Sequence, residues 1–162
     1  MKRFDLARHA PPGIDLKYEK NTFAWGFIIA FFVSTGFLGR LDHQYRITFK
    51  EGVVVQYPMP EFLTILGQGL VAFHILIPCM LAFAIYHYLY HRTGSKSVYL
   101  MRRLPDRWEY HRRCLTLPLA GAGLAFLAEV ILLLFYFWIY VLVIPETNLI
   151  PGQFATIWRA LL

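Results

Sequence analysis

One acid and two histidines are the residues of this sequence that could do chemistry inside an apolar environment. Glu129 is the only acid in residues 117–144, and His74 and His87 are the only histidines in residues 62–90. A carboxylate in such surroundings is costly unless it faces protein, water or an opposite charge. We therefore expect Glu129 to serve either a polar path or a structural hydrogen bond to a neighbouring helix. His74 lies well inside its segment, whereas His87 lies near one end.

Cofactor chemistry has little support in the sequence. Cys79 falls within one apolar segment and Cys114 at the start of another, with no Cys-x-x-Cys pair and no Cys/His cluster. Neither a disulfide framework nor a structural zinc site is predicted. Residues 94–97, Gly-Ser-Lys-Ser, look like a fragment of a phosphate-binding loop, but the Gly-x-x-x-x-Gly-Lys-(Ser/Thr) order is absent. We expect no bound cofactor or metal and no ATPase within the chain.

The apolar residues occur in three long runs. Of the 162 residues, 57% are hydrophobic and 16% are charged, against roughly one quarter charged in soluble domains. Runs at residues 22–39, 62–90 and 117–144 are each long enough for a helix to cross a bilayer. The sequence thus predicts an all-α membrane protein with three transmembrane helices. Pro78 predicts a kink or tilt in the second.

Basic residues are unevenly distributed around these runs. Residues 1–21 hold five Lys and Arg and residues 91–116 hold seven, against three in residues 40–61 and one in residues 145–162. The positive-inside rule predicts a multi-pass protein of the cell membrane with a cytoplasmic N-terminus. The mostly polar first 21 residues favour a retained first helix over a signal peptide. The basic cytoplasmic segments, which lie next to the head groups of the lipid bilayer, account for the net charge of +6. The charge therefore does not predict a nucleic acid partner.

Two segments are predicted on the outer side. In residues 40–61, β-prone stretches at 45–49 and 53–57 flank a Gly52 turn, which predicts a small extracellular hairpin, with an irregular loop as the alternative. In residues 145–162, apolar side chains recur at a spacing of three and four, which predicts an amphipathic helical tail on the outer leaflet. Its apolar residues are Phe154, Ile157, Trp158, Leu161 and Leu162.

The cytoplasmic loop, residues 91–116, carries the most information. Gly94 and Ser95 break the chain, residues 97–103 can form two helical turns, and Pro105 suits the start of a new helix. A basic linker that binds anionic lipid head groups through Arg112 and Arg113 would account for the charge. It would not account for the apolar edge that Met101, Leu104 and Trp108 form at a spacing of three and four.

This order of elements resembles the ABC-2 type permeases of ATP-driven transporters. The matching residues are Arg92, Gly94, Ser95, Leu100, Leu104, Pro105, Arg107, Trp108 and Glu109. The resemblance covers about twenty-five residues and the placement of the two flanking spans. It departs from the family at Arg102 and Arg103, where acidic residues are common, and in having three spans where the family usually has six.

The resemblance implies a membrane subunit that couples a separate ATPase subunit to transport and needs at least one further membrane subunit. The residues implied to contact the ATPase are Ser97, Leu100, Met101, Arg102, Arg103, Leu104, Pro105, Arg107 and Trp108. The chain itself would not be an enzyme. Neither the substrate nor the direction of transport follows from the sequence.

Two other functions are consistent with three spans. His74, and less readily His87, suggests a membrane anchor of a haem and quinone oxidoreductase, since haem between helices needs axial histidines. An accessory membrane subunit without its own transport path is the other alternative. A Soret absorption band would identify the first, and co-purification with a nucleotide-binding subunit would identify the transporter.

Overall fold

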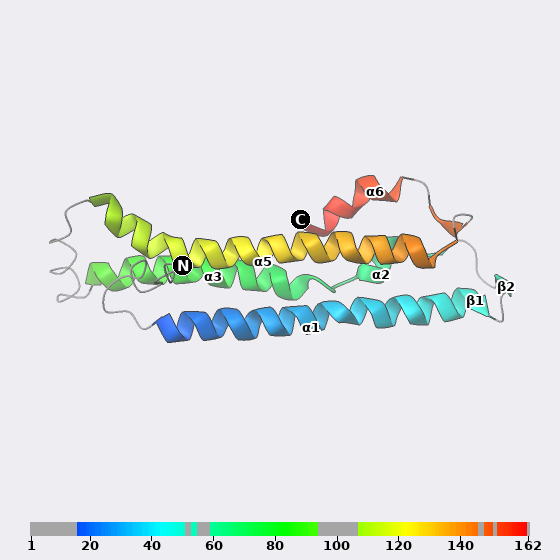
Figure 1. Cartoon of the computed structure of the whole chain (residues 1–162), viewed down its shortest axis with the longest axis horizontal. Helices are drawn as coiled ribbons and strands as arrows, with labels where there is room; N and C mark the ends of the chain where they lie inside the picture. Colours follow the sequence, from blue (N-terminus) through cyan, green and yellow to red (C-terminus); the bar gives the residue numbers. More distant parts are fainter. Residues whose placement is uncertain are drawn as a thin grey trace, which may run out of the picture. The chain divides into compact units, whose positions relative to one another are not determined.

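Three long helices make up most of the structure (Figure 1). The computed structural model describes residues 16–50, 53–54, 59–93, 107–145, 148–150 and 152–161. The helices are α1 (Leu16–Thr48), α3 (Val71–Thr93) and α5 (Arg107–Val143). Each is long and apolar enough to cross a membrane, which confirms the prediction of an all-α, three-span membrane protein.

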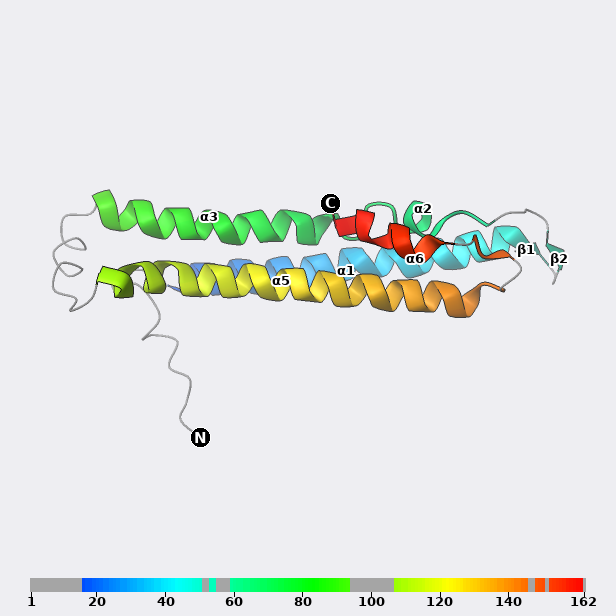
Figure 2. The ribbon, with the colours of Figure 1, turned by 90° about the horizontal axis from the view of Figure 1, so that it is seen from above.

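The chain divides into two compact units. Unit 1 comprises Met1–Phe27 and Ile75–Phe126, and unit 2 comprises Ile28–His74 and Leu127–Leu162. Each unit therefore takes part of each long helix. Within unit 1, the segments of α1 and α5 run in the same direction while the segment of α3 runs against them (Figures 1 and 2). Large apolar side chains remain exposed along all three helices, among them Phe32, Ile85 and Leu142. Such faces are expected to contact lipid.

The first helix continues well beyond its apolar run. The predicted span ends at residue 39, but α1 extends to Thr48, and Arg46 donates to the Asp42 carboxylate at 2.9 Å, one turn away. The β-prone stretch at residues 45–49 is therefore mostly helical. Of the expected hairpin, the described part is a short antiparallel pair, β1 (Phe49–Lys50) and β2 (Val53–Val54).

The second span is interrupted near its start. Residues 62–90 were expected to form one helix with an irregularity at Pro78, but the chain forms α2 (Phe62–Leu66), a turn, and then α3, which continues through Pro78. Gly67 has φ +48°, a conformation that favours glycine. The break leaves the Leu66 carbonyl outside the regular helix, where the Arg40 guanidinium donates to it at 2.6 Å. This contact gives the Leu66 carbonyl a donor just before the candidate span Val71–Tyr90 begins.

Aromatic rings form the core of unit 2. The Phe37 ring lies 5.6 Å from Phe62 and 4.8 Å from Tyr136, and the Ser34 hydroxyl is 2.9 Å from the Tyr136 hydroxyl. These contacts join α1, α2 and α5. The buried hydroxyls are thereby paired, as buried polar groups need to be.

The C-terminal tail packs on α2 and α5. It forms α6 (Gln153–Thr156) and a 3-10 helix, η3 (Ile157–Leu161). Gln153 accepts from the Phe62 backbone N–H at 3.2 Å and so caps α2, and its amide donates to the Tyr140 hydroxyl at 3.4 Å. Ile157 is fully buried, whereas Phe154 is exposed. One face of the tail thus packs against unit 2, while Phe154 remains exposed on the surface.

Close approach of helices in unit 1 depends on glycine. A Cβ at Gly121 would lie 2.6 Å from the Met80 side chain, and one at Gly26 would lie 2.6 Å from Leu76. Small residues at these positions let backbones approach within a membrane. Gly123 has open space around it, so this requirement does not apply to every glycine of α5.

Candidate functional site

Most residues of the expected ATPase contact fall outside the described part of the chain. These are Ser97, Leu100, Met101, Arg102, Arg103, Leu104 and Pro105, all within residues 94–106. Arg107 is the first residue of α5, and its side chain is not among those described. Trp108 is described: its side chain is 77% exposed and its ring lies 6.1 Å from that of His111. The apolar edge is therefore visible only at Trp108.

Glu129 and His74 meet in unit 2. Nε2 of His74 lies 3.0 Å from Oε1 of Glu129, and the Glu129 side chain is 1% exposed against 37% for His74. The two atoms are at ion-pair distance but are not aligned as a hydrogen bond. Glu129 thus faces protein and an imidazole from α3. An isolated charge there would be strongly disfavoured, so the contact balances the carboxylate when the imidazole is protonated.

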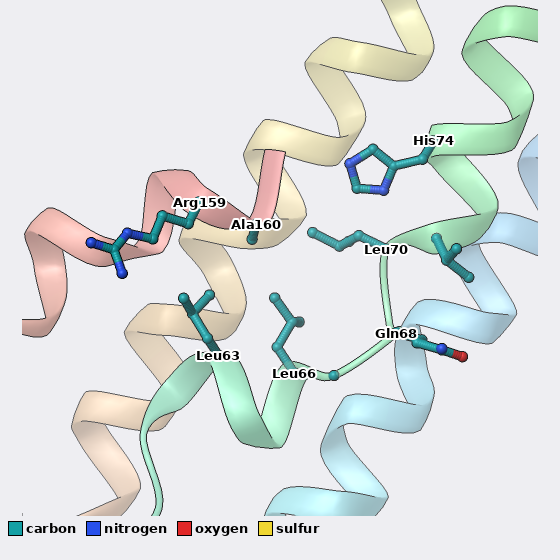
Figure 3. Close-up of a pocket in the computed structure, with 9 residues that line it drawn as sticks. Leu63, Leu66, Gln68, Leu70, His74, Arg159 and Ala160 are labelled. Carbon is teal, nitrogen blue, oxygen red and sulfur yellow. The ribbon is translucent and has the colours of Figure 1, made fainter. Parts of the chain in front are cut away.

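A cavity of about 300 Å³ lies beside His74 (Figure 3). Leu63, Leu66 and Leu70 line it together with Ala160 of the tail, and Gly67 and Gln68 of the helix break also contribute. Figure 3 shows the apolar side chains between His74 and Arg159, whose guanidinium extends away from the imidazole. The cavity is thus largely apolar, with a titratable group at one end.

The helix break and His74 are neighbours along the chain. His74 follows the unwound residues 67–70 by one turn of α3. Interrupted membrane helices often bring polar backbone and side chains to the sites where transporters bind their substrates. In the sequence, Gly67 and Gly69 alone are equally consistent with close packing of an intact helix. The reach of Arg40 to the Leu66 carbonyl, which supports the break, has no signal in the sequence.

Unit 1 holds a second buried acid that sequence reasoning missed. Glu19 was assigned to the N-terminal tail, but it lies in α1, is 3% exposed, and has its Oε2 at 3.3 Å from Nε2 of His87. Neither carboxylate oxygen has an aligned hydrogen bond within the described residues. The signal was available in the spacing of Glu19, Phe23 and Gly26, which places them on one helical face.

The other nitrogen of His87 contacts α5. Nδ1 lies 3.3 Å from the backbone carbonyl oxygen of Cys114. Pro118, four residues later, has no N–H to donate to that carbonyl, so the imidazole donates in its place. His87 thereby links α3 to both α1 and α5.

A further contact joins α3 and α5 near residues 94–106, which connect them. The Tyr88 hydroxyl forms a hydrogen bond with Nδ1 of His111, and the two rings lie 5.5 Å apart. Because Tyr88 and His87 are adjacent in α3, both contacts hold the same end of this helix against α5. The two helices are thus fastened together close to the loop that connects them.

The ring nitrogens of the histidines within the spans have partners in the same chain at three described positions. No group of three or more His, Cys, Asp or Glu side chains that could hold a metal ion occurs in the described ranges. Nε2 of His74 and Nε2 of His87 each face a carboxylate, and Nδ1 of His87 faces a carbonyl. A haem iron bound at any of these three nitrogens would have to displace the contact described.

Comparison with known proteins gives no relative for this chain. No family model, no curated protein and no solved structure matches it.

Proposed function

We propose that this chain is a membrane subunit of an ATP-driven transporter, in which residues 97–105, with Arg107 and Trp108, contact a separate ATPase subunit. At least one further membrane subunit would complete the transport path. The observation that carries this proposal is the Glu129–His74 contact next to the break between α2 and α3. Both features are more typical of transport proteins than of passive anchors.

Glu129 carries an energetic cost. Placing an acid at the centre of a membrane helix costs roughly 2.5–3.5 kcal/mol on insertion scales. The His74 contact offsets part of that cost. A subunit that moves a polar or charged species across the membrane gains a site where charge can be held and exchanged.

The contacts at the other end of α3 support the coupling role. A loop that transmits motion from an ATPase needs rigid helices at both of its ends. The His87–Cys114 and Tyr88–His111 contacts fasten α3 to α5 near residues 94–106. Movement of the loop would then shift the two helices together instead of spreading them apart.

The haem anchor fits the geometry less well. An axial histidine needs a ring nitrogen directed at the iron. The ring nitrogens of His74 and His87 described above face carboxylates and a carbonyl of the same chain. The transporter proposal needs no such displacement.

Purification of the tagged full chain from its native membrane tests the proposal. A nucleotide-binding ATPase subunit that co-purifies in stoichiometric amount supports it. A Soret band without an ATPase would favour the haem anchor. Membrane subunits alone, without either, would favour an accessory role.

A further inference from the structure

Unit 1 contains a crevice that the transporter proposal does not use. It has a volume of about 380 Å³ and lies between α1, α3 and α5. Its walls are mainly apolar and include Phe23, Met80, Leu117 and Leu124, while Glu19 and Lys20 contribute the charged groups. A volume of this size is in the range that small-molecule sites occupy.

The charged part of the crevice consists of the adjacent residues Glu19 and Lys20. The Glu19 side chain is 3% exposed, and neither of its oxygens has an aligned hydrogen-bond donor in the described chain, although His87 lies at 3.3 Å. A buried carboxylate with unused acceptor sites favours a cationic donor. Lys20 is exposed next to it and offers an ammonium for an anion. The pair is complementary to a zwitterion with neighbouring positive and negative groups.

The crevice lies where the charged residues of α1 and α5 give way to apolar ones. Lys20 is the last charged residue of α1 before Arg40, and Arg113 is the last basic residue of α5 before its apolar run. Leu117 and Leu124 come one and three turns after Arg113 on α5. The crevice therefore extends from the charged border of the spans into their apolar part.

We propose that this crevice binds a bilayer phospholipid with a primary-amine head group. The ammonium donates to the Glu19 carboxylate, the phosphate lies against Lys20, and one acyl chain lies along Phe23, Leu117 and Leu124. A choline head group has no N–H to donate, and a glycerol head group has no cation. Glu19 thus selects the head group, and the apolar walls hold the chain.

Head-group selectivity of the unmodified protein is the first test. The purified full chain is incubated with equal amounts of ethanolamine, choline and glycerol phospholipids of identical acyl chains, and bound lipid is measured by native mass spectrometry. A charge-assisted hydrogen bond predicts retention of the ethanolamine lipid on the order of tenfold above choline. Equal retention of all three, or strongest retention of the glycerol lipid, would overturn the proposal.

Two matched pairs of variants locate the site. Glu19→Gln should lower ethanolamine lipid to the choline level, whereas Glu61→Gln, at an exposed acid of unit 2, should not. Ala120→Phe should fill the crevice and reduce all three lipids, whereas Leu119→Phe, at an exposed neighbour outside the lining, should not. Unchanged selectivity in Glu19→Gln would contradict the assignment of the carboxylate. Unchanged binding in Ala120→Phe would contradict the crevice itself, whatever the fate of the ATPase contact.

Discussion

Nδ1 of His87 lies 3.3 Å from the backbone carbonyl oxygen of Cys114, joining α3 to α5 inside unit 1. The contact exists because Pro118 cannot donate the intrahelical hydrogen bond that this carbonyl would otherwise accept. With its Nδ1 hydrogen used in this way, the imidazole turns Nε2 toward Glu19 at 3.3 Å. The imidazole therefore lies between the Cys114 carbonyl of α5 and the Glu19 side chain of α1.

A double-mutant cycle tests this relationship. His87→Phe should destabilise the protein by about 1–3 kcal/mol, because it leaves the Cys114 carbonyl and the Glu19 carboxyl without their partner. In a Pro118→Ala background the carbonyl regains an N–H donor, so the same change should cost about 1 kcal/mol less. Unfolding of the detergent-solubilised chain, followed by tryptophan fluorescence, gives the four free energies. Additive effects would show that Pro118 and His87 are not linked through the carbonyl.

The break in the second span predicts opposite effects for two glycines. A Cβ at Gly69 would lie 3.1 Å from both the Arg40 guanidinium and the Leu66 carbonyl oxygen, so Gly69→Ala should destabilise by about 1–3 kcal/mol. Gly39 lies in α1 with open space around it, so Gly39→Ala should be neutral or stabilise by up to about 1 kcal/mol. The same unfolding assay compares them. A stable Gly69→Ala protein would mean that the break tolerates a regular helix.

The three spans could be predicted from the sequence because apolar runs of this length are typical of helices that cross a bilayer. The interruption at residues 67–70 could not, since it depends on Arg40, which is 26 residues away from Leu66 in the sequence. Gly67 and Gly69 alone are equally consistent with close packing of an intact helix. Pro78, the obvious irregular residue, lies inside α3.

Some residues of the polar sites could likewise be predicted from the sequence, and others could not. Glu129 was identified because it is the only acid in its run, and His74 because it lies deep in another. Glu19 was overlooked because Lys17 and Lys20 beside it suggest a solvated tail, and its burial depends on His87 from α3. The His87–Cys114 contact was partly predictable, since a proline within a helix always leaves the carbonyl four residues earlier without its donor.

Substitution of Glu129 separates a functional acid from an incidental one. Glu129→Gln should weaken ATP-driven activity or assembly, and Glu129→Leu should weaken it further, because the site loses its charge and then all polarity. The readouts are the yield of intact complex and its ATPase rate. His74→Phe combined with Glu129→Leu should restore stability if the two residues act only as a pair. Full assembly and activity in Glu129→Leu alone would remove the acid from the functional site.

Orientation is tested by labelling single cysteines in intact cells, with Cys79 and Cys114 replaced. The distribution of Lys and Arg predicts that Ile150→Cys reacts with an impermeant maleimide added outside. Val98→Cys should react only after the membrane is permeabilised. The reverse pattern would place residues 94–106 outside the cell, where no ATPase could reach them.

The ATPase contact is tested most directly by co-purification of the tagged full chain and its variants from native membranes. Met101→Ser with Leu104→Ser removes the apolar edge and keeps the charge, whereas Arg112→Gln with Arg113→Gln lowers the charge and keeps the edge. The transporter proposal predicts that the first pair loses the ATPase subunit while still inserting into the membrane, and that the second pair retains most of it. Undiminished ATPase recovery with the serine pair, or no ATPase with the parent chain, would contradict it.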